Sequence, residues 1–222
     1  FLQDHLGPAL PPVFAIENEV EIADFLLEHL QREQAPLYGL VLAGGRSTRM
    51  GQDKSLFNYH GKPQREFMAD LLSHWCGKVF ISCRGDQVEE IGGQYLPLPD
   101  TFLGLGPYGA ILSAFREHPD AAWLVVASDL PHLDEATLEQ LIAQRNPAKV
   151  ASTFKSPFDQ FPEPLVTIWE PRSYQLLLQF MAQGYSCPRK VLLNSPIELL
   201  VTENAQALEN VNKPDELQRA LG

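Results

Sequence analysis

The chain has 222 residues, 45% of them hydrophobic, and a formal net charge of −11. This length suits one α/β core with an appendage, and the composition excludes wholesale disorder. The acidic balance excludes a general nucleic-acid binder, which needs a broad basic surface. No apolar run approaches the roughly 20 residues that cross a bilayer, so no membrane partner is expected. Three widely spaced cysteines without a CxxC pair favour a reducing, cytoplasmic setting.

Residues 1–36 differ from the rest, and they are predicted to be an N-terminal extension or the remnant of a preceding domain. They begin at Phe1 rather than Met, as expected of a fragment. Val13–Ile16 is predicted to form a short strand, and apolar residues at helical spacing predict a helix over Glu19–Gln31. Residues 37–222 then form the second predicted domain.

From residue 37 onward, strand-like and helix-like segments alternate. This order predicts βαβ units and a three-layer α/β/α, Rossmann-like fold with a mostly parallel sheet. Ligands of such sheets bind beyond the carboxyl ends of the strands, so a site is expected there. The predicted strands are Tyr38–Leu42, Lys78–Cys83, Ala122–Ala127, Val150–Phe154 and Leu165–Trp169. The predicted helices are Gln64–Cys76, Gly109–Glu117, Asp134–Arg145, Pro171–Gln183, Pro188–Leu193 and Pro214–Leu221.

The strongest motif is the sequence LAGGRSTRMGQDK, which occupies residues 42–54 directly after the first predicted strand. Its glycines let backbone N–H groups approach phosphate oxygens and form an anion-binding nest. We expect the loop to bind a triphosphate chain whose charge is neutralised by Arg46, Arg49 and Lys54. The spacing fits neither a Walker A loop nor a dinucleotide fingerprint. An ordinary strand–loop–helix turn is the alternative.

LAGGRSTRMGQDK resembles the LxGGxSxRMGxDK loop of enzymes that transfer a nucleoside monophosphate from a nucleoside triphosphate. From about Tyr38 to Leu221 the chain is most similar to the molybdenum-cofactor guanylyltransferase family. The resemblance implies a nucleotide-diphospho-sugar-transferase-like fold and Mg²⁺ as cofactor. It also implies that GMP is transferred from GTP to molybdopterin with release of pyrophosphate. The alternatives are the same chemistry with CTP or another acceptor, and a non-catalytic nucleotide-binding partner in cofactor maturation.

The N-terminal segment carries a weaker resemblance. Residues 13–30 are similar to the C-terminal end of the GTP-binding adapter protein of the same pathway. This implies a fusion with that adapter, and the adapter and molybdoenzyme maturation proteins as partners. An unrelated extension whose helix packs on the sheet is the alternative.

Two positions are candidates for the metal. Asp129 ends an apolar predicted strand, where a carboxylate is well placed to hold Mg²⁺ on a triphosphate. The resemblance implies the same role, and an N-cap for a segment that starts at Pro131 is the alternative. The sequence NVNKP from Asn210 to Pro214 resembles the family's NxNxP ending, which implies that Asn212 helps to hold the metal and Asn210 the acceptor. Asn212 is also a plausible N-cap before Pro214.

Further residues are implied to contact the nucleotide. Asp100 precedes a glycine-rich segment and is implied to bind guanine or ribose, with a turn aspartate as the alternative. Ser82 stands near the place of a family Asn that touches the nucleotide. Gly106 and Gly109 are expected to let the backbone approach it. The implied nucleotide-binding residues are Leu42, Ala43, Gly44, Gly45, Arg46, Lys54, Ser82, Asp100, Gly106 and Asp129. The implied catalytic residues are Arg49, Lys54 and Asp129.

The acceptor side is expected towards the C-terminal half. Gln160–Thr167 resembles a family stretch near the pterin acceptor, although Glu163 stands where a His or Gln is usual. Arg189 and Lys190 open a short predicted helix and are expected to bind the acceptor's phosphate. A solvated basic turn is the alternative. Cys187, just before them, is expected to be buried and inert.

Overall fold

The computed structural model describes residues 14–15, 17–32, 34–43, 54–56, 58, 60–91 and 93–210. The contacts between residues divide the chain into two compact units, Phe1–Gln34 and Ala35–Gly222. Within the described ranges, no helix has the length and apolar character that a bilayer crossing requires. The predicted helix over Pro214–Leu221 lies outside the described residues.

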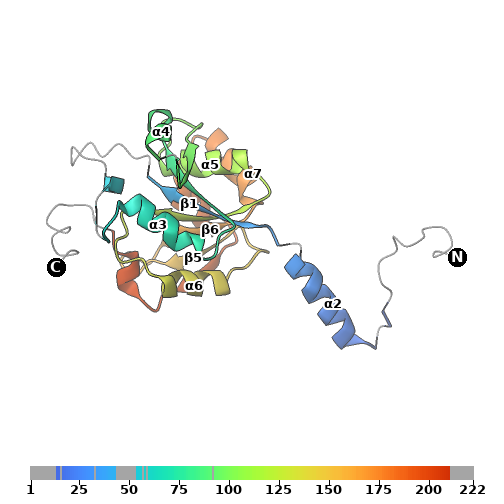
Figure 1. The fold of residues 1–222 in the computed structure, drawn as a ribbon. Helices are drawn as coiled ribbons and strands as arrows, with labels where there is room; N and C mark the ends of the chain where they lie inside the picture. The colour runs from blue at the N-terminus through green and yellow to red at the C-terminus, as the bar shows by residue number, and fades with distance from the viewer. Residues whose placement is uncertain are drawn as a thin grey trace. The chain divides into compact units, whose positions relative to one another are not determined.

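The first unit contains one long helix, α2, which spans Glu19–Arg32 (Figure 1). Two acidic residues in its first turn suit the positive end of the helix dipole. The helix predicted here is confirmed to within one residue at its end. The strand predicted over Val13–Ile16 is wrong where the structure describes it, because Phe14 and Ala15 lie in no strand. The ring of Phe14 packs instead against that of Phe25, with centroids 5.0 Å apart.

The second unit is built on a seven-stranded sheet (Figure 1). Its strands are β1 (Leu37–Leu42), β2 (Lys78–Cys83), β3 (Leu96–Pro99), β4 (Ala122–Ala127), β5 (Ala151–Lys155), β6 (Pro162–Trp169) and β7 (Glu198–Val201). Their spatial order is β3-β2-β1-β4-β6-β5-β7. All neighbours are parallel except the two pairs that involve β6. The predicted mostly parallel sheet is therefore confirmed.

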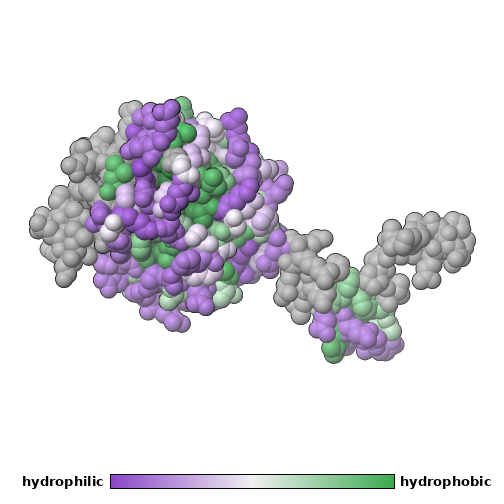
Figure 2. All heavy atoms as spheres, viewed as in Figure 1, coloured by the Kyte–Doolittle hydropathy of each residue, from purple (hydrophilic) through white to green (hydrophobic). Residues whose placement is uncertain are grey.

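Helices cover both faces of this sheet and give the predicted three layers (Figure 1). They are α3 (Gln64–Ser73), α4 (Val88–Ile91), α5 (Pro107–Glu117), α6 (Glu135–Ala143), α7 (Ser173–Ala182) and α8 (Pro188–Leu193). Successive strand residues point to opposite faces. Thus Val41 packs in the core cluster that contains α3 and α6, whereas Leu40 packs in the cluster that contains α5, α7 and α8. Polar side chains cover most of the face seen in Figure 2, because each helix buries only one side.

The elements that the sequence did not predict are short ones at the edges. β3 reads LPLP, and its prolines break the usual strand pattern. Because proline has no N–H to donate, it is tolerated on an edge strand, which is the place of β3 in this sheet. β7 is the other edge strand, and the four-residue α4 lies between β2 and β3. None of the three is long enough to show a clear periodicity.

Candidate functional site

The parallel register brings the ends of three central strands together. Leu42, the last residue of β1, pairs with Ser82 of β2 on one side and with Ala127 of β4 on the other. The amide of Ser128 also donates to the Leu42 carbonyl at 3.3 Å. The strand ends that sequence analysis selected are therefore neighbours, and they define one edge of the sheet as the candidate site.

The glycine-rich loop begins at this edge. Ala43, the first residue after β1, is 5% exposed. Lys54 starts a short 3-10 helix, η2, which spans Lys54–Leu56. The other loop residues predicted to bind phosphate, Gly44, Gly45, Arg46 and Arg49, lie outside the described residues, as does Asn212.

Ser82 and Asp100 form one hydrogen-bonded unit. The Ser82 hydroxyl donates to Oδ1 of Asp100 at 2.9 Å, and the Asp100 amide donates to the Cys83 carbonyl at 2.9 Å. Burial raises the pKa of the Asp100 carboxyl, and the Ser82 hydrogen bond opposes this rise. The structure thus joins two residues that the sequence singled out separately, and it holds a half-buried carboxylate at the end of β3.

Gly106, just before α5, and Gly109, inside it, require glycine for different structural reasons. Gly106 is the N-cap of α5 with φ 57° and ψ −138°, a conformation that is essentially restricted to glycine. Gly109 has no such backbone requirement. A Cβ there would lie 2.2 Å from the carbonyl oxygen of Phe102. Close packing within the protein therefore accounts for Gly109, whereas the sequence suggested an approach to the nucleotide.

Asp129 lies in the turn that follows β4. No helix starts at Pro131; α6 begins at Glu135, and its N-cap is Asp134, which accepts from the Thr137 amide at 2.8 Å. The alternative N-cap role of Asp129 is therefore wrong. Its carboxylate is at the carboxyl end of the central strand, as predicted, with Oδ1 buried.

Glu163 is a buried carboxylate near the start of β6. β6 pairs antiparallel with β4, whose carboxyl end leads to Asp129. Glu163 is 7% exposed. Burial raises the pKa of its carboxyl; the Leu165 amide and the charge of Arg189 oppose this, and the charges of Asp159 and Asp129 add to it. Sequence analysis noted Glu163 only as a departure from the family pattern.

The cations expected to bind the acceptor both have partners within the protein. Nη1 of Arg189 lies 2.6 Å from Oδ2 of Asp159, and Nη2 lies 3.7 Å from Oε2 of Glu163. Nζ of Lys190 lies 3.4 Å from the centre of the Tyr185 ring. The sequence gave no signal for these contacts, because their partners are far away along the chain or belong to another element.

Two other expected features can be placed on this side. Asn210 is exposed at the end of the described residues. Cys187 is also exposed, so its expected burial is wrong. It is the N-cap of α8, which is only six residues long and has few side chains to cover its start.

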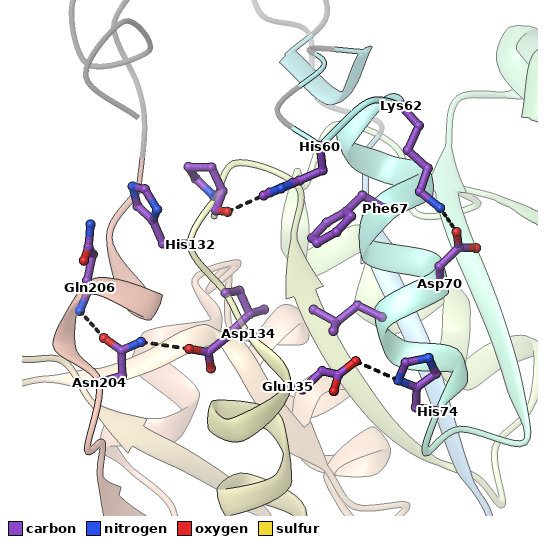
Figure 3. Close-up of a pocket in the computed structure, with 13 residues that line it drawn as sticks. His60, Lys62, Phe67, Asp70, His74, His132, Asp134, Glu135, Asn204 and Gln206 are labelled. Atoms are coloured by element: carbon purple, nitrogen blue, oxygen red, sulfur yellow. Dashed lines mark hydrogen bonds and ion pairs between the residues drawn. The ribbon is translucent and has the colours of Figure 1, made fainter. Parts of the chain in front are cut away.

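A cavity of about 600 Å³ lies beside this edge, between α3, the segment before α6 and the turn near Asn204 (Figure 3). On one wall His60 stacks on Phe67 with ring centroids 3.8 Å apart, and Nε2 of His60 lies 2.9 Å from the Pro131 carbonyl oxygen. On the other, Asn204 donates to Asp134 at 2.9 Å. None of the described residues predicted to bind nucleotide, metal or acceptor lines this cavity.

Comparison with known proteins decides the family. Residues 39–197 match the MobA-like NTP transferase domain. The chain belongs to this family. The match spans the sheet from β1 to the segment before β7, and it confirms the family resemblance predicted from residues 42–54.

Relatives of this MobA-like domain have related names. The chain is 38% identical over 184 residues to the molybdenum cofactor biosynthesis bifunctional protein of Synechocystis sp., covering 82% of this chain and 53% of that protein. It is 41% identical over 111 residues to the molybdenum cofactor guanylyltransferase of Xanthomonas euvesicatoria, covering 50% and 56%. The chain thus spans about half the length of these two relatives.

A solved structure supports the fold of the MobA-like domain. Molybdopterin-guanine dinucleotide biosynthesis protein A from Archaeoglobus fulgidus superposes with a TM-score of 0.68 at 23% identity, covering 82% of this chain and 96% of that one. The likeness confirms the predicted α/β/α class.

Proposed function

We propose that this chain transfers GMP from GTP to molybdopterin, with Mg²⁺, and releases pyrophosphate. The observation that carries the proposal is the family match over residues 39–197, together with the edge at which Leu42, the Ser82–Asp100 pair and Asp129 meet. The names of the relatives supply the guanine and the molybdenum cofactor.

The nucleotide would lie over β1, β2 and β3. The loop residues Gly44, Gly45, Arg46, Arg49 and Lys54 would hold the triphosphate, with Leu42, Ala43 and Gly106 close to the nucleotide. Asp100 would accept hydrogen bonds from the guanine N–H groups or from a ribose hydroxyl. Ser82 supports this role because its hydroxyl fixes one carboxylate oxygen, which leaves the other to face a ligand. A preorganised acceptor loses little entropy on binding.

Asp129 and Asn212 would hold the Mg²⁺. The donor set fits, because a carboxylate oxygen at a strand end is a ligand that Mg²⁺ prefers. In the described ranges, no group of three or more His, Cys, Asp or Glu side chains could hold a metal by themselves. A site with one protein carboxylate is usual where phosphate oxygens of the substrate complete the coordination. When bound, the ion neutralises charge on the phosphates.

The reaction needs no strong general base. The nucleophile is a phosphate oxygen of the acceptor, which is already ionised at neutral pH. It attacks the α-phosphorus of GTP, a new P–O bond forms there, and the bond to the bridging oxygen breaks as pyrophosphate leaves. The task of the protein is to position the two phosphates and to neutralise their charge.

The acceptor would lie towards β6 and α8, where Arg189, Lys190 and Asn210 are proposed to bind it. The contact from Nη2 of Arg189 to Glu163 is long at 3.7 Å, so this nitrogen has an N–H group to donate to a phosphate while Nη1 keeps its bond to Asp159. We also propose the GTP-binding adapter and molybdoenzyme maturation proteins as partners, a cytoplasmic setting, and residues 1–36 as an extension or domain remnant.

Pyrophosphate release with molybdopterin as acceptor tests the proposal. We expect release with GTP and Mg²⁺, and little with CTP, ATP or UTP. Asp129→Asn should lose turnover and keep the thermal midpoint within a few degrees. Asp120→Asn is the matched control, because Asp120 is exposed just before the opposite end of the same strand. Absence of release with all four triphosphates would refute the function, and normal turnover by Asp129→Asn would refute the metal assignment.

A further inference from the structure

Arg65, the second residue of α3, is a buried arginine with unused hydrogen-bond donors. Only 3% of the surface of Arg65 is exposed to solvent. Nε and Nη1 are buried and have no hydrogen-bond partner within the part of the chain that the structure describes. Nη2 lies 3.9 Å from Oε1 of Glu90, which is beyond hydrogen-bond distance. Most of the N–H donors of this guanidinium are therefore unused.

Arg145 provides a comparison, because it is a largely buried arginine whose guanidinium is paired within the protein. Its Nε and Nη2 donate to the two carboxylate oxygens of Glu170 at 2.7 and 2.9 Å, and Nη2 also donates to the Ala35 carbonyl at 3.3 Å. Such a paired guanidinium needs no ligand. Because a buried charge with unsatisfied hydrogen-bond donors is costly, the contrast indicates that Arg65 is arranged for an anion that comes from outside the chain.

The environment of Arg65 is that of an anion site. Arg65 lies in the first turn of the ten-residue helix α3, and Pro63, the N-cap of this helix, makes no side-chain capping hydrogen bond. Helix N-termini attract anions through unpaired N–H groups and the helix dipole.

Arg65 also lies near the edge where the nucleotide is proposed to bind. Gln64, the buried residue before it, donates from Nε2 to the carbonyl of Leu130 at 3.4 Å, and Leu130 directly follows Asp129. The thiol of Cys83, at the end of β2, is affected by the charges of both Arg65 and Asp100. Burial raises the pKa of its thiol to about 11, the charge of Asp100 adds to the rise, and the charge of Arg65 opposes it. Arg65 and Asp100 therefore act on the same thiol, at the strand end next to Ser82. In the sequence, α3 is the first long helix after the glycine-rich loop.

We propose that Arg65 binds the phosphate chain of the nucleoside triphosphate. The inference rests on the proposed function and adds a contact beyond the glycine-rich loop. The planar guanidinium suits phosphate geometry, so the free energy lost by burying it in the ligand-free protein is recovered when the ligand binds.

The test combines stability and binding, with inorganic tripolyphosphate as the probe. Arg65→Met keeps the length of the side chain and removes its charge. We expect it to keep or raise the thermal midpoint of the ligand-free protein and to weaken tripolyphosphate and GTP binding at least about tenfold in titration calorimetry. Binding of guanosine should change less than about twofold. Arg65→Lys should bind tripolyphosphate with intermediate affinity.

Arg145→Met is the matched control, because it breaks a pair that is already complete. We expect a lower thermal midpoint without a specific loss of tripolyphosphate affinity. A fall of the midpoint, or loss of folding, in Arg65→Met as in Arg145→Met would overturn the inference, and so would unchanged tripolyphosphate binding. Tripolyphosphate binding tests this inference separately from the proposed function. If the wild type releases no pyrophosphate but Arg65→Met still weakens tripolyphosphate binding, only the proposed function is refuted.

Discussion

Gly109 offers the sharpest test of how the fold positions the site. In Gly109→Ala, the new Cβ would lie 2.2 Å from the Phe102 carbonyl oxygen and 3.3 Å from Cβ of Leu105. The segment that carries Phe102 must therefore retreat by about 1 Å. The amides of Thr101 and Phe102 donate to Oγ of Ser113 at 2.8 and 3.3 Å, and a shift of this size breaks these bonds.

The cost can be worked out from these contacts. Overpacking costs about 1–3 kcal/mol, and two lost hydrogen bonds cost about 1 kcal/mol each. Replacing glycine by alanine inside a helix returns about 1 kcal/mol. The net loss is about 2–4 kcal/mol, which for a domain of this size corresponds to roughly 5–15 °C in the midpoint. Since Asp100 precedes the displaced segment directly, GTP affinity should also fall.

Thermal unfolding by circular dichroism and GTP titration measure the two effects. Gly85→Ala is the control, because a Cβ at Gly85 meets nothing within 4 Å and its backbone is ordinary. Gly85→Ala should unfold within about 2 °C of the wild type. The reasoning is refuted if Gly109→Ala matches this control in midpoint and in GTP affinity.

Two further substitutions test the site and the core. Asp100→Asn should weaken GTP binding about tenfold or more at neutral pH and keep or raise stability, because the folded protein raises the pKa of the Asp100 carboxyl and so disfavours its charged form. Because the pKa of Asp100 is raised, its protonation should begin to weaken GTP binding by the wild type at a pH above 3.8, the ordinary carboxyl pKa. A GTP affinity that does not change with pH down to 3.8 would contradict the assignment. Tyr108→Phe removes a buried hydroxyl that donates to the Leu177 carbonyl at 2.7 Å, and should cost about 1–2 kcal/mol in chemical denaturation; unchanged stability would count against that bond.

Local periodicity was enough to predict the central elements. β2 and β4 have the predicted bounds, because continuous apolar runs indicate strands that are covered on both faces. β6 begins at Pro162, three residues earlier than predicted. The prediction began too late because Pro162 and Glu163 interrupt the apolar run. β3 could not be predicted, since its two prolines are tolerated only through its place at the sheet edge.

The candidate site was predicted residue by residue but not as a constellation. Asp129 was selected because it follows a predicted strand, and Asp100 because it precedes a glycine-rich segment that resembles the family's. That Asp100 bonds to Ser82, and that Glu163 lies close enough to Asp129 for their charges to interact, depends on strand pairing between segments far apart in sequence. Arg189 was read as a free cation, and only the folded chain shows its bond to Asp159.

By itself, the sequence determined the α/β class and the family, because these depend on local pattern and motif, and it predicted phosphate binding by residues 42–54. Only the tertiary structure decided which charges are paired. Arg65 and Arg145 cannot be told apart by residue type, yet Arg145 meets Glu170 and Arg65 keeps unused donors among the described residues. The reason is physical: hydrophobic spacing is written along the chain, whereas the partner of a buried charge is set by long-range packing.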